Sequence, residues 1–282
     1  MKIALMPNLT RPDAAAVTAG ICRELDRLGA QWYCSAQTSQ LIDPNHRGHV
    51  ADERGIFENA DVIITVGGDG SVIRAVRQSS VTGGKVLGVN AGRLAYLCEL
   101  DPGELNLLEK LVRGEYGIQK RMMLRATVKE DGKEIYSAEG INDIVFRRDA
   151  GANLIGLDVS ANGRKIADYY ADGVIFATPT GSSAYSLSAG GAIVEPTIQA
   201  TLVTPICPHS LIIRPYVFSP QTVFSVRPDS GNVNTVLSVD GGAPVELSEK
   251  SVVTVTRAER CAEFVTLKSN IFIDVLNKKL GQ

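Results

Sequence analysis

The most informative segment of the chain reads Val62-Ile63-Ile64-Thr65-Val66-Gly67-Gly68-Asp69-Gly70-Ser71. Its first half is an apolar, β-branched run, which is typical of a strand buried on both faces of a parallel sheet. Three glycines around one aspartate then predict a tight turn, and the residues after it are compatible with a helix. A strand, a glycine-rich turn and a helix N-terminus present free N–H groups and a favourable dipole to a phosphate. The segment therefore predicts an α/β fold with a phosphate site at this turn.

Asp69 is the unexpected residue of the turn, because its negative charge repels a phosphate. A carboxylate fits there if it faces a hydroxyl to be deprotonated, or a magnesium ion carried by the phosphates. Short glycine patterns also occur where nothing binds, and a plain strand-to-helix turn explains this motif equally well on its own. The motif alone leaves both interpretations open.

Composition places the chain among ordinary globular proteins. Of its 282 residues, 44% are hydrophobic and 21% are charged, and the formal net charge is −2. That length provides two domains, or one large one, with an ample core. The small net charge gives no electrostatic case for nucleic acid or an anionic membrane, and no apolar run reaches the length of a membrane helix. We expect neither kind of partner.

The five cysteines are scattered along the chain, odd in number and without metal-ligand spacing. Such a pattern is typical of reduced thiols in a cytoplasmic protein. The N-terminal run Met1–Pro7 is too short for a signal peptide and predicts a first strand instead. We expect a cytoplasmic protein that holds no metal through its own side chains.

Predicted strands and helices alternate up to about residue 116. The strands are Lys2–Met6, Gln31–Cys34, Val62–Val66 and Lys85–Val89, the helices are Pro12–Leu28, Val72–Gln78 and Glu104–Arg113, and Asp43–Gly55 is a predicted loop. Alternation with short connections predicts a parallel, Rossmann-like sheet that is covered on both faces.

From Arg121 to Arg260 strands become frequent and helices scarce. The predicted strands are Leu124–Lys129, Gly140–Arg147, Asn153–Ala161, Val223–Val226, Thr235–Val239 and Val252–Arg257. Turn signals between them predict a mostly antiparallel second domain. A helix over Asn270–Leu280 is expected to return to the first domain. The predicted organisation is an α/β domain over residues 1–116, a β-rich domain over 117–262 and a C-terminal segment over 263–282.

A second unusual segment reads Thr178-Pro179-Thr180-Gly181-Ser182-Ser183-Ala184-Tyr185-Ser186-Leu187-Ser188-Ala189-Gly190-Gly191. Ser182 or Thr180 is placed to cap a helix over Tyr185–Ala189. Small residues let such a helix lie against a flat ligand, and Tyr185 offers an aromatic face to a base. A short capped helix that packs through small residues explains the segment as well.

Taken together and in this order, the motifs closely resemble those of NAD kinases of the bacterial type. The matching segments are Gly67–Gly70, Gly88–Leu94, Asn142–Asp143, Asp172–Gly173, Thr178–Gly191 and Pro205–Leu211. The glycine turn is also found in lipid kinases and phosphofructokinase relatives, so it is only moderately specific. The run from Thr178 is highly specific, and the resemblance covers nearly the whole chain.

The resemblance implies an enzyme that transfers the γ-phosphoryl group of ATP, or in some members of polyphosphate, to the 2′-hydroxyl of the adenosine ribose of NAD. Such a transfer needs in-line positioning, charge neutralisation and a proton acceptor. By the resemblance, Asp69 is the general base. Gly67, Gly68 and Gly70 let the donor phosphates approach the backbone, with Mg²⁺ neutralising those phosphates.

The resemblance also implies the contacts to NAD, residue by residue. Asn142 and Asp143 match a pair that holds ribose and adenine groups, and Asp172 matches a residue near the nicotinamide. The adenine and pyrophosphate contacts match Thr180, Ser183, Ala184, Tyr185 and Ser188, and Tyr96 matches an aromatic residue beside the dinucleotide. Arg93 and Arg148 are candidate phosphate contacts, for which a solvated surface arginine is an equal alternative.

Four residues depart mildly from the family pattern. Ser71 and Ser183 stand where threonine is usual, Asp143 where glutamate is common and Ala95 where glycine is usual. Ser71 remains a candidate contact to the phosphates. These changes bear on affinity and donor preference rather than on the reaction. For His209, in a stretch that the family places near a subunit contact, we expect a buried, hydrogen-bonded structural role.

Two other functions compete with this interpretation. A lipid or sphingoid kinase on the same scaffold needs an apolar cleft, whereas Thr180–Ser188 is small and polar. A non-catalytic dinucleotide-binding regulator has little need for the carboxylate of Asp69. We therefore predict an NAD kinase whose substrates are NAD and ATP. By the family resemblance we expect a homodimer or homotetramer built through the β-rich domain, whose strand edges need cover.

Overall fold

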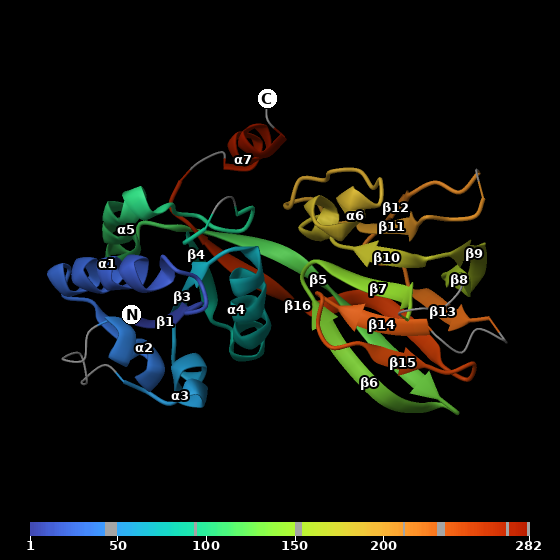
Figure 1. Cartoon of the computed structure of the whole chain (residues 1–282), viewed down its shortest axis with the longest axis horizontal. Coiled ribbons are helices and arrows are strands. Elements are labelled where there is room, and N and C mark those ends of the chain that lie inside the picture. The colour runs from blue at the N-terminus through green and yellow to red at the C-terminus, as the bar shows by residue number, and fades with distance from the viewer. Residues whose placement is uncertain are drawn as a thin grey trace. The chain divides into compact units, whose positions relative to one another are not determined.

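The computed structural model describes residues 1–42, 50–92, 95–149, 154–210, 212–229, 235–268 and 271–280. The chain forms two compact units (Figure 1): Met1–Lys120 together with Ala262–Gln282, and Arg121–Cys261. Two long strands, β5 (Gly117–Glu130) and β16 (Val252–Thr266), each run from one unit into the other.

The first unit is built on a parallel sheet. Its strands are β1 (Lys2–Pro7), β2 (Gln31–Cys34), β3 (Val62–Gly67) and β4 (Lys85–Asn90), in the spatial order β2-β1-β3-β4. All three pairings between them are parallel, and Phe264 of β16 extends the sheet beside β4. Every residue of β3 is buried, as expected for the central strand of a sheet covered on both faces.

Helices connect the parallel strands, because a parallel crossover needs a long connection. They are α1 (Ala14–Arg27) between β1 and β2, α2 (Ala36–Ile42) and α3 (Glu53–Glu58) between β2 and β3, and α4 (Asp69–Thr82) between β3 and β4. The 3₁₀ helix η2 (Pro102–Leu107) and α5 (Leu108–Arg113) follow β4. On α1 the residues Ala14, Thr18, Ile21, Cys22 and Leu25 recur at helical spacing and are buried. The chain ends in α7 (Ile271–Leu280), which belongs to this unit.

The second unit contains two groups of antiparallel strands. One is a six-stranded sheet in the order β12-β11-β10-β7-β14-β15, formed by β12 (Tyr216–Phe218), β11 (Thr201–Ile206), β10 (Gly173–Ala177), β7 (Asp143–Arg148), β14 (Thr235–Val239) and β15 (Val245–Leu247). In the other, β13 (Phe224–Pro228) lies between β16 and β8 (Ile155–Ala161), β9 (Arg164–Ala171) pairs with β8, and β6 (Lys133–Gly140) pairs with β5.

The core of the second unit is aromatic at its centre. Phe146 and Phe224 each pack edge-on against Phe176, with ring centroids 5.6 and 5.1 Å apart, and all three side chains are fully buried. Edge-to-face pairs of this kind add to the free energy gained by burial. Residues of β7, β10 and β14 contribute to this core, and the candidate residues Asp143, Thr178 and Asp240 lie in or directly after these strands.

The predicted fold class, a parallel α/β unit and a mostly antiparallel β unit, is confirmed. Of the predicted loop over Asp43–Gly55, residues 43–49 lie outside the described residues, and the prediction is wrong at its end, because α3 already begins at Glu53. The carboxylate of Asp52 accepts a hydrogen bond from the N–H of Gly55 and so caps this helix, a local signal that the polar composition concealed. In the part of the chain that is described, no helix is long and apolar enough to cross a membrane.

Candidate functional site

The glycine turn lies at the carboxyl edge of the parallel sheet in the first unit. β3 ends at Gly67, Gly68 is the N-cap residue, and α4 begins at Asp69. Two neighbouring strands end beside it: the N–H of Asn8 donates to the carbonyl of Val66 (2.8 Å), and that of Ala91 to the carbonyl of Gly67 (3.0 Å). Ligands of open α/β sheets bind outside this edge, so the turn stands where the fold favours a binding site.

The three glycines of the turn have different steric roles. A Cβ atom on Gly67 would lie 2.2 Å from Oγ and 2.8 Å from Cβ of Ser71, so the buried Ser71 requires glycine there. A Cβ on Gly68 meets only Nη2 of Arg11, at 4.0 Å, and one on Gly70 meets nothing within 4 Å. Gly68 and Gly70 therefore leave open space above the turn, which a phosphate can enter.

Replacing Gly67 and Gly70 separately by alanine tests this difference. We expect Gly67→Ala to lower the free energy of unfolding by about 1–3 kcal/mol, because the new methyl group overlaps Ser71. Gly70→Ala is expected to leave stability unchanged or to raise it by up to about 1 kcal/mol, since alanine is the better helix former. Urea denaturation of both variants measures the effect, and equal stabilities would contradict it.

Asp69 is half-buried in the first turn of α4, and a fixed backbone donor orients it. Its Oδ1 accepts a hydrogen bond from the N–H of Leu97 at 2.9 Å. The neighbouring Tyr96 has a pKa above its usual value, mainly because of burial and then because of the negative charge of Asp69. The structure thus brings Asp69 and Tyr96 close together, as expected if both belong to one site. Arg93 lies outside the described residues.

In the second unit, the backbone of Ile141, Asn142 and Asp143 is held by the carboxylate of Asp240. Oδ2 of Asp240 accepts from the N–H of Ile141 (2.8 Å), and Oδ1 accepts from those of Asn142 (2.7 Å) and Asp143 (3.1 Å). Asp240 itself has a left-handed backbone, with φ of +49°, in the turn after β14. In the sequence, Asp240-Gly241-Gly242 is one of the turn signals between the predicted strands. An aspartate directly before two glycines, at the end of a predicted strand, is the local signal that could have marked Asp240 as a candidate.

Asp143, the first residue of β7, is a buried carboxyl group. Only 6% of it is exposed, and burial raises its pKa from 3.8 to about 7, with the nearby charge of Asp240 as the second cause. Near neutral pH its side chain therefore exists partly in the protonated form. In that form it donates a hydrogen bond, which an ionised carboxylate does not do.

The raised pKa of Asp143 predicts a pH dependence of stability. Between about pH 4 and 7 the folded chain binds a proton at this site that the unfolded chain has lost, so stability falls as the pH rises, by up to about 1.4 kcal/mol per pH unit. We expect Asp143→Asn to be more stable than the wild type at pH 8 but not at pH 5, in urea denaturation. The exposed Asp158→Asn is the control, and an equal gain at both pH values would contradict the assignment.

A cavity of about 350 Å³ lies beside these residues. Its lining includes Asn142, Asp143, Ala184 and Tyr185, four of the residues predicted to contact NAD, together with Arg147, Ser238 and Asp240, which the sequence reasoning missed. All belong to the second unit. Tyr185 is 42% exposed, so its ring is accessible to a ligand. A hollow with an aromatic ring and a few converging polar groups is typical of a small-molecule site.

The Thr-Pro-Thr-Gly run packs directly on the same backbone. The N–H of Thr178 donates to the carbonyl of Asn142 (2.9 Å), and a Cβ on Gly181 would lie 2.0 Å from that carbonyl oxygen. The hydroxyl of Thr178 donates to the carbonyl of Ile141 and accepts from the N–H of Gly181. Glycine at 181 is thus required for this close approach. The run supports the Asn142 backbone from one side while Asp240 holds it from another.

The prediction that Ser182 or Thr180 caps the following helix is wrong. The helix α6 (Tyr185–Ser188) has Ala184 as its N-cap residue, without a side-chain cap. The hydroxyl of Ser182 instead donates to the carbonyl of Pro179 (2.6 Å) and accepts from the N–H of Val194 (2.9 Å). It therefore closes the turn before the helix. Thr180 is buried, Ser183 half-buried and Ser188 exposed, and none of the three lines the cavity.

Arg148 and Asp172 form an ion pair, with Nε 2.8 Å from Oδ1. The N–H of Arg148 also donates to the carbonyl of Asp172 (3.0 Å), so strand pairing and charge hold the two residues together away from the cavity lining. The expected burial of His209 is wrong. This residue is exposed, its N–H donates to the carbonyl of Tyr170, and its ring lies edge-on to that of Tyr170 at 6.2 Å.

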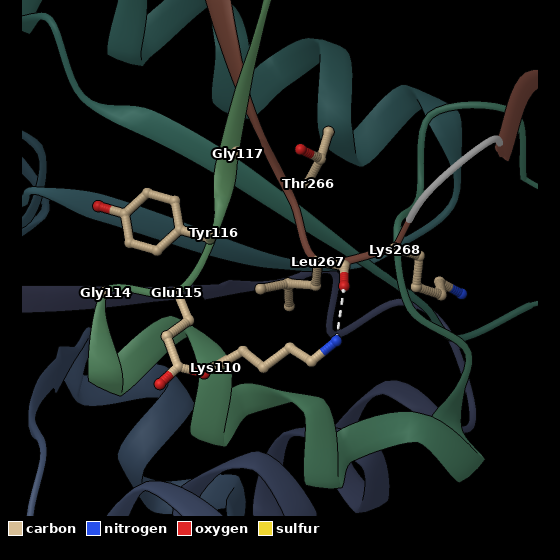
Figure 2. A pocket seen from close by; sticks show the side chains of 8 residues that line it. All are labelled: Lys110, Gly114, Glu115, Tyr116, Gly117, Thr266, Leu267 and Lys268. Carbon is tan, nitrogen blue, oxygen red and sulfur yellow. Dashed lines mark hydrogen bonds between the residues drawn. The ribbon is translucent and has the colours of Figure 1, made fainter.

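A more voluminous cavity in the first unit contains none of the predicted residues (Figure 2). It is lined by Lys110, Gly114, Glu115, Tyr116, Gly117, Thr266, Leu267 and Lys268. Its two lysines are already engaged, because Lys110 donates to the carbonyl of Leu267 (3.3 Å) and Lys268 pairs with Glu104 (2.7 Å). We assign it no ligand. Across the described residues, no group of three or more His, Cys, Asp or Glu side chains is placed to hold a metal ion.

Comparison with known proteins agrees with the motif analysis. Residues 29–116 match the family model described as the ATP-NAD kinase N-terminal domain, and residues 141–267 match the ATP-NAD kinase C-terminal domain. The chain is 35% identical to an NAD kinase of Caldanaerobacter subterraneus subsp. tengcongensis, over 100% of this chain and 99% of that protein. It is 38% identical to an NAD kinase of Symbiobacterium thermophilum, over 99% of both.

Solved structures show the same likeness. The structure of yeast NADH kinase complexed with NADH has a TM-score of 0.90 at 28% identity, covering 100% of this chain and 87% of that one. An NAD kinase from Archaeoglobus fulgidus, in complex with ATP, has a TM-score of 0.75 at 22% identity and covers 100% and 98%. At that identity the second structure supports the fold alone.

Proposed function

The chain belongs to the NAD kinase family, and from this premise we propose that it transfers the γ-phosphoryl group of ATP to the 2′-hydroxyl of the adenosine ribose of NAD, giving NADP. The family resemblance and the enzyme class predicted from the sequence are thereby confirmed, and the lipid kinase alternative is set aside. The observation that carries the reaction is Asp69, oriented by Leu97 at the glycine turn.

In the proposed reaction Asp69 accepts the proton of the 2′-hydroxyl. The ribose oxygen then forms a bond to the γ-phosphorus, and the bond from that phosphorus to the β,γ-bridging oxygen breaks. ADP leaves with the electron pair of that bond, and the net products are NADP, ADP and a proton. Positioning and charge stabilisation dominate such transfers, so a half-buried carboxylate held by a backbone N–H suits this role.

The donor phosphates are proposed to lie over the open side of the turn, at Gly67, Gly68, Gly70 and Ser71. There the 14-residue helix α4 directs the positive end of its dipole at them. Mg²⁺ would enter bound to the donor and neutralise its charge. Asp69 is the acidic residue of the first turn of α4. Because this turn offers a single carboxylate, most ligands of the ion would be phosphate oxygens of the donor.

We propose that NAD binds through the second unit, with the ribose and adenine groups at Asn142 and Asp143. The support is the cavity that these residues share with Ala184 and Tyr185. Thr180, Ser183 and Ser188 remain proposed contacts to adenine and pyrophosphate. Asp172 remains a proposed contact near the nicotinamide, Arg148 a proposed phosphate contact, and Tyr96 a proposed aromatic neighbour of the dinucleotide. Residues 1–116 are proposed to hold the donor and 117–262 the acceptor.

A homodimer or homotetramer in the cytoplasm remains our proposal for assembly and location. The edge strand β12 of the six-stranded sheet has Val217 60% and Tyr216 39% exposed. An apolar sheet edge of this kind needs a cover, which a second copy of the chain supplies. Light scattering in solution measures the mass directly, and a monomer would contradict this part of the proposal.

The donor is tested by incubating purified protein with NAD, Mg²⁺ and either ATP or polyphosphate, and detecting NADP with an NADP-specific dehydrogenase. We expect NADP with ATP. If NADP forms with polyphosphate but not with ATP, the proposed donor is contradicted. If NAD binds in calorimetry but neither donor yields NADP, the non-catalytic regulator would be the better explanation.

A further inference from the structure

Arg11 lies beside the glycine turn, a position that the sequence motifs did not reveal. It belongs to the loop after β1, which is fixed by Asn8. The side-chain Oδ1 of Asn8 accepts from the N–H (3.2 Å) and the hydroxyl (2.7 Å) of Thr10, and its carbonyl accepts from the N–H of Arg11 (3.0 Å). Because the N–H of Asn8 also donates to Val66 at the end of β3, this loop is attached to the strand that carries the turn.

The guanidinium of Arg11 lies over two glycines from different strand ends. A Cβ built on Gly68 would be 4.0 Å from Nη2 of Arg11, and one built on Gly92 would be 4.0 Å from Nη1. Both glycines lack the side chain that would fill this space. The guanidinium therefore lies next to two positions where the backbone carries no side chain, so a ligand can approach both the guanidinium and the backbone there.

The charge of Arg11 is unbalanced at this position. The side chain is exposed and forms no ion pair within the described part of the chain. It also stands near the N-terminus of α4, where the helix dipole is positive and disfavours a cation. A bound anion with several negative oxygens would relieve both costs, and a planar guanidinium binds two such oxygens at once.

We propose that Arg11 binds the phosphate chain of the donor and holds it against the turn at Gly68 and Gly92. This rests on the proposed function only in taking the donor to be a phosphate chain. The recognised chemistry is shared by ATP and polyphosphate, so Arg11 acts on either. Its loop is fixed by Asn8 before the donor arrives, which limits the entropy lost on binding.

The test compares Arg11→Ala and Arg11→Lys with Arg23→Ala. Arg23 is an exposed arginine of α1 whose Nη2 also lies near a glycine, 3.8 Å from a Cβ on Gly20. We expect Arg11→Ala to raise the KM for ATP about 10- to 100-fold, the loss of a charge-assisted hydrogen-bonding pair. Arg11→Lys should give a smaller rise, because a point charge replaces the two-pronged donor. The KM for NAD and the melting temperature should stay at wild-type values, as both should in Arg23→Ala.

Polyphosphate is assayed in parallel, so that an error about the donor is distinguished from an error about Arg11. If the wild type uses polyphosphate and not ATP, the proposed donor fails, and the same rise in KM for polyphosphate still supports Arg11. A KM for the active donor within about twofold of the wild type in Arg11→Ala would overturn the inference. An equal rise in the KM values for both substrates would also overturn it.

Discussion

Asp69→Asn is expected to lower kcat about 10²- to 10⁴-fold, the usual contribution of a general base. The amide cannot take the proton of the ribose hydroxyl. Its carbonyl oxygen can still accept the N–H of Leu97, so the turn should keep its geometry. Calorimetry should then show NAD binding within a few-fold of the wild type, and the melting temperature should be little changed. Steady-state kinetics with saturating NAD and ATP measures the loss.

Asp13→Asn is the matched control for this variant. Asp13 is exposed, precedes α1 in the same unit and makes no side-chain cap. Its replacement by asparagine therefore removes one negative charge, as in Asp69→Asn, but at a position outside the proposed site. We expect wild-type turnover from it. Turnover of Asp69→Asn within about threefold of the control would remove Asp69 from the chemistry, because even a weak general base contributes more than that.

Asp240→Ala is expected to have the largest effect on stability and on NAD affinity. The carboxylate of Asp240 accepts three backbone N–H groups, from Ile141, Asn142 and Asp143. Its removal leaves three partly buried donors without their acceptor, and each of these hydrogen bonds contributes about 0.5–1.5 kcal/mol to stability. The backbone that carries Asn142 and Asp143 also loses its support, so the KM for NAD should rise more than tenfold while that for ATP changes little.

Asp131→Ala separates this effect from backbone strain. Asp131 also has a left-handed backbone, with φ of +48° against +49° for Asp240, but among the described residues its carboxylate pairs only with exposed Lys250, at 3.5 Å. Both substitutions therefore place alanine in the same unfavourable conformation. We expect Asp240→Ala to be less stable than Asp131→Ala by about 2–4 kcal/mol in urea denaturation. Equal losses would mean that the three hydrogen bonds contribute nothing.

Local patterns predicted the parts of the fold that local physics determines. The β-branched run to Val66 forms the fully buried β3, and the glycines after it span the end of β3 and the start of α4. The alternation of strands and helices correctly predicted the parallel unit, since such a crossover needs a long connection. The loop prediction failed at α3, where one capping aspartate outweighed a polar composition.

Parts of the candidate site that depend on distant residues were not predictable in this way. Asp240 supports Asn142 across 98 positions of sequence, and no local pattern reports such a contact. Arg11 reaches the glycine turn from the loop after a different strand, and only the parallel order of β1 and β3 brings them together. Ser182 carries a hydroxyl that could cap a helix, but this hydroxyl instead donates to the carbonyl of Pro179 and accepts from the N–H of Val194.

The decisive measurement is the product stoichiometry of the wild-type chain with NAD, ATP and Mg²⁺, by chromatographic separation of the nucleotides. We predict one NADP for each ADP formed, with the new phosphate on the 2′-oxygen of the adenosine ribose, and no ADP when NAD is omitted. ADP and free phosphate without NADP would contradict phosphoryl transfer to NAD, and with it the role of the carboxylate at the glycine turn.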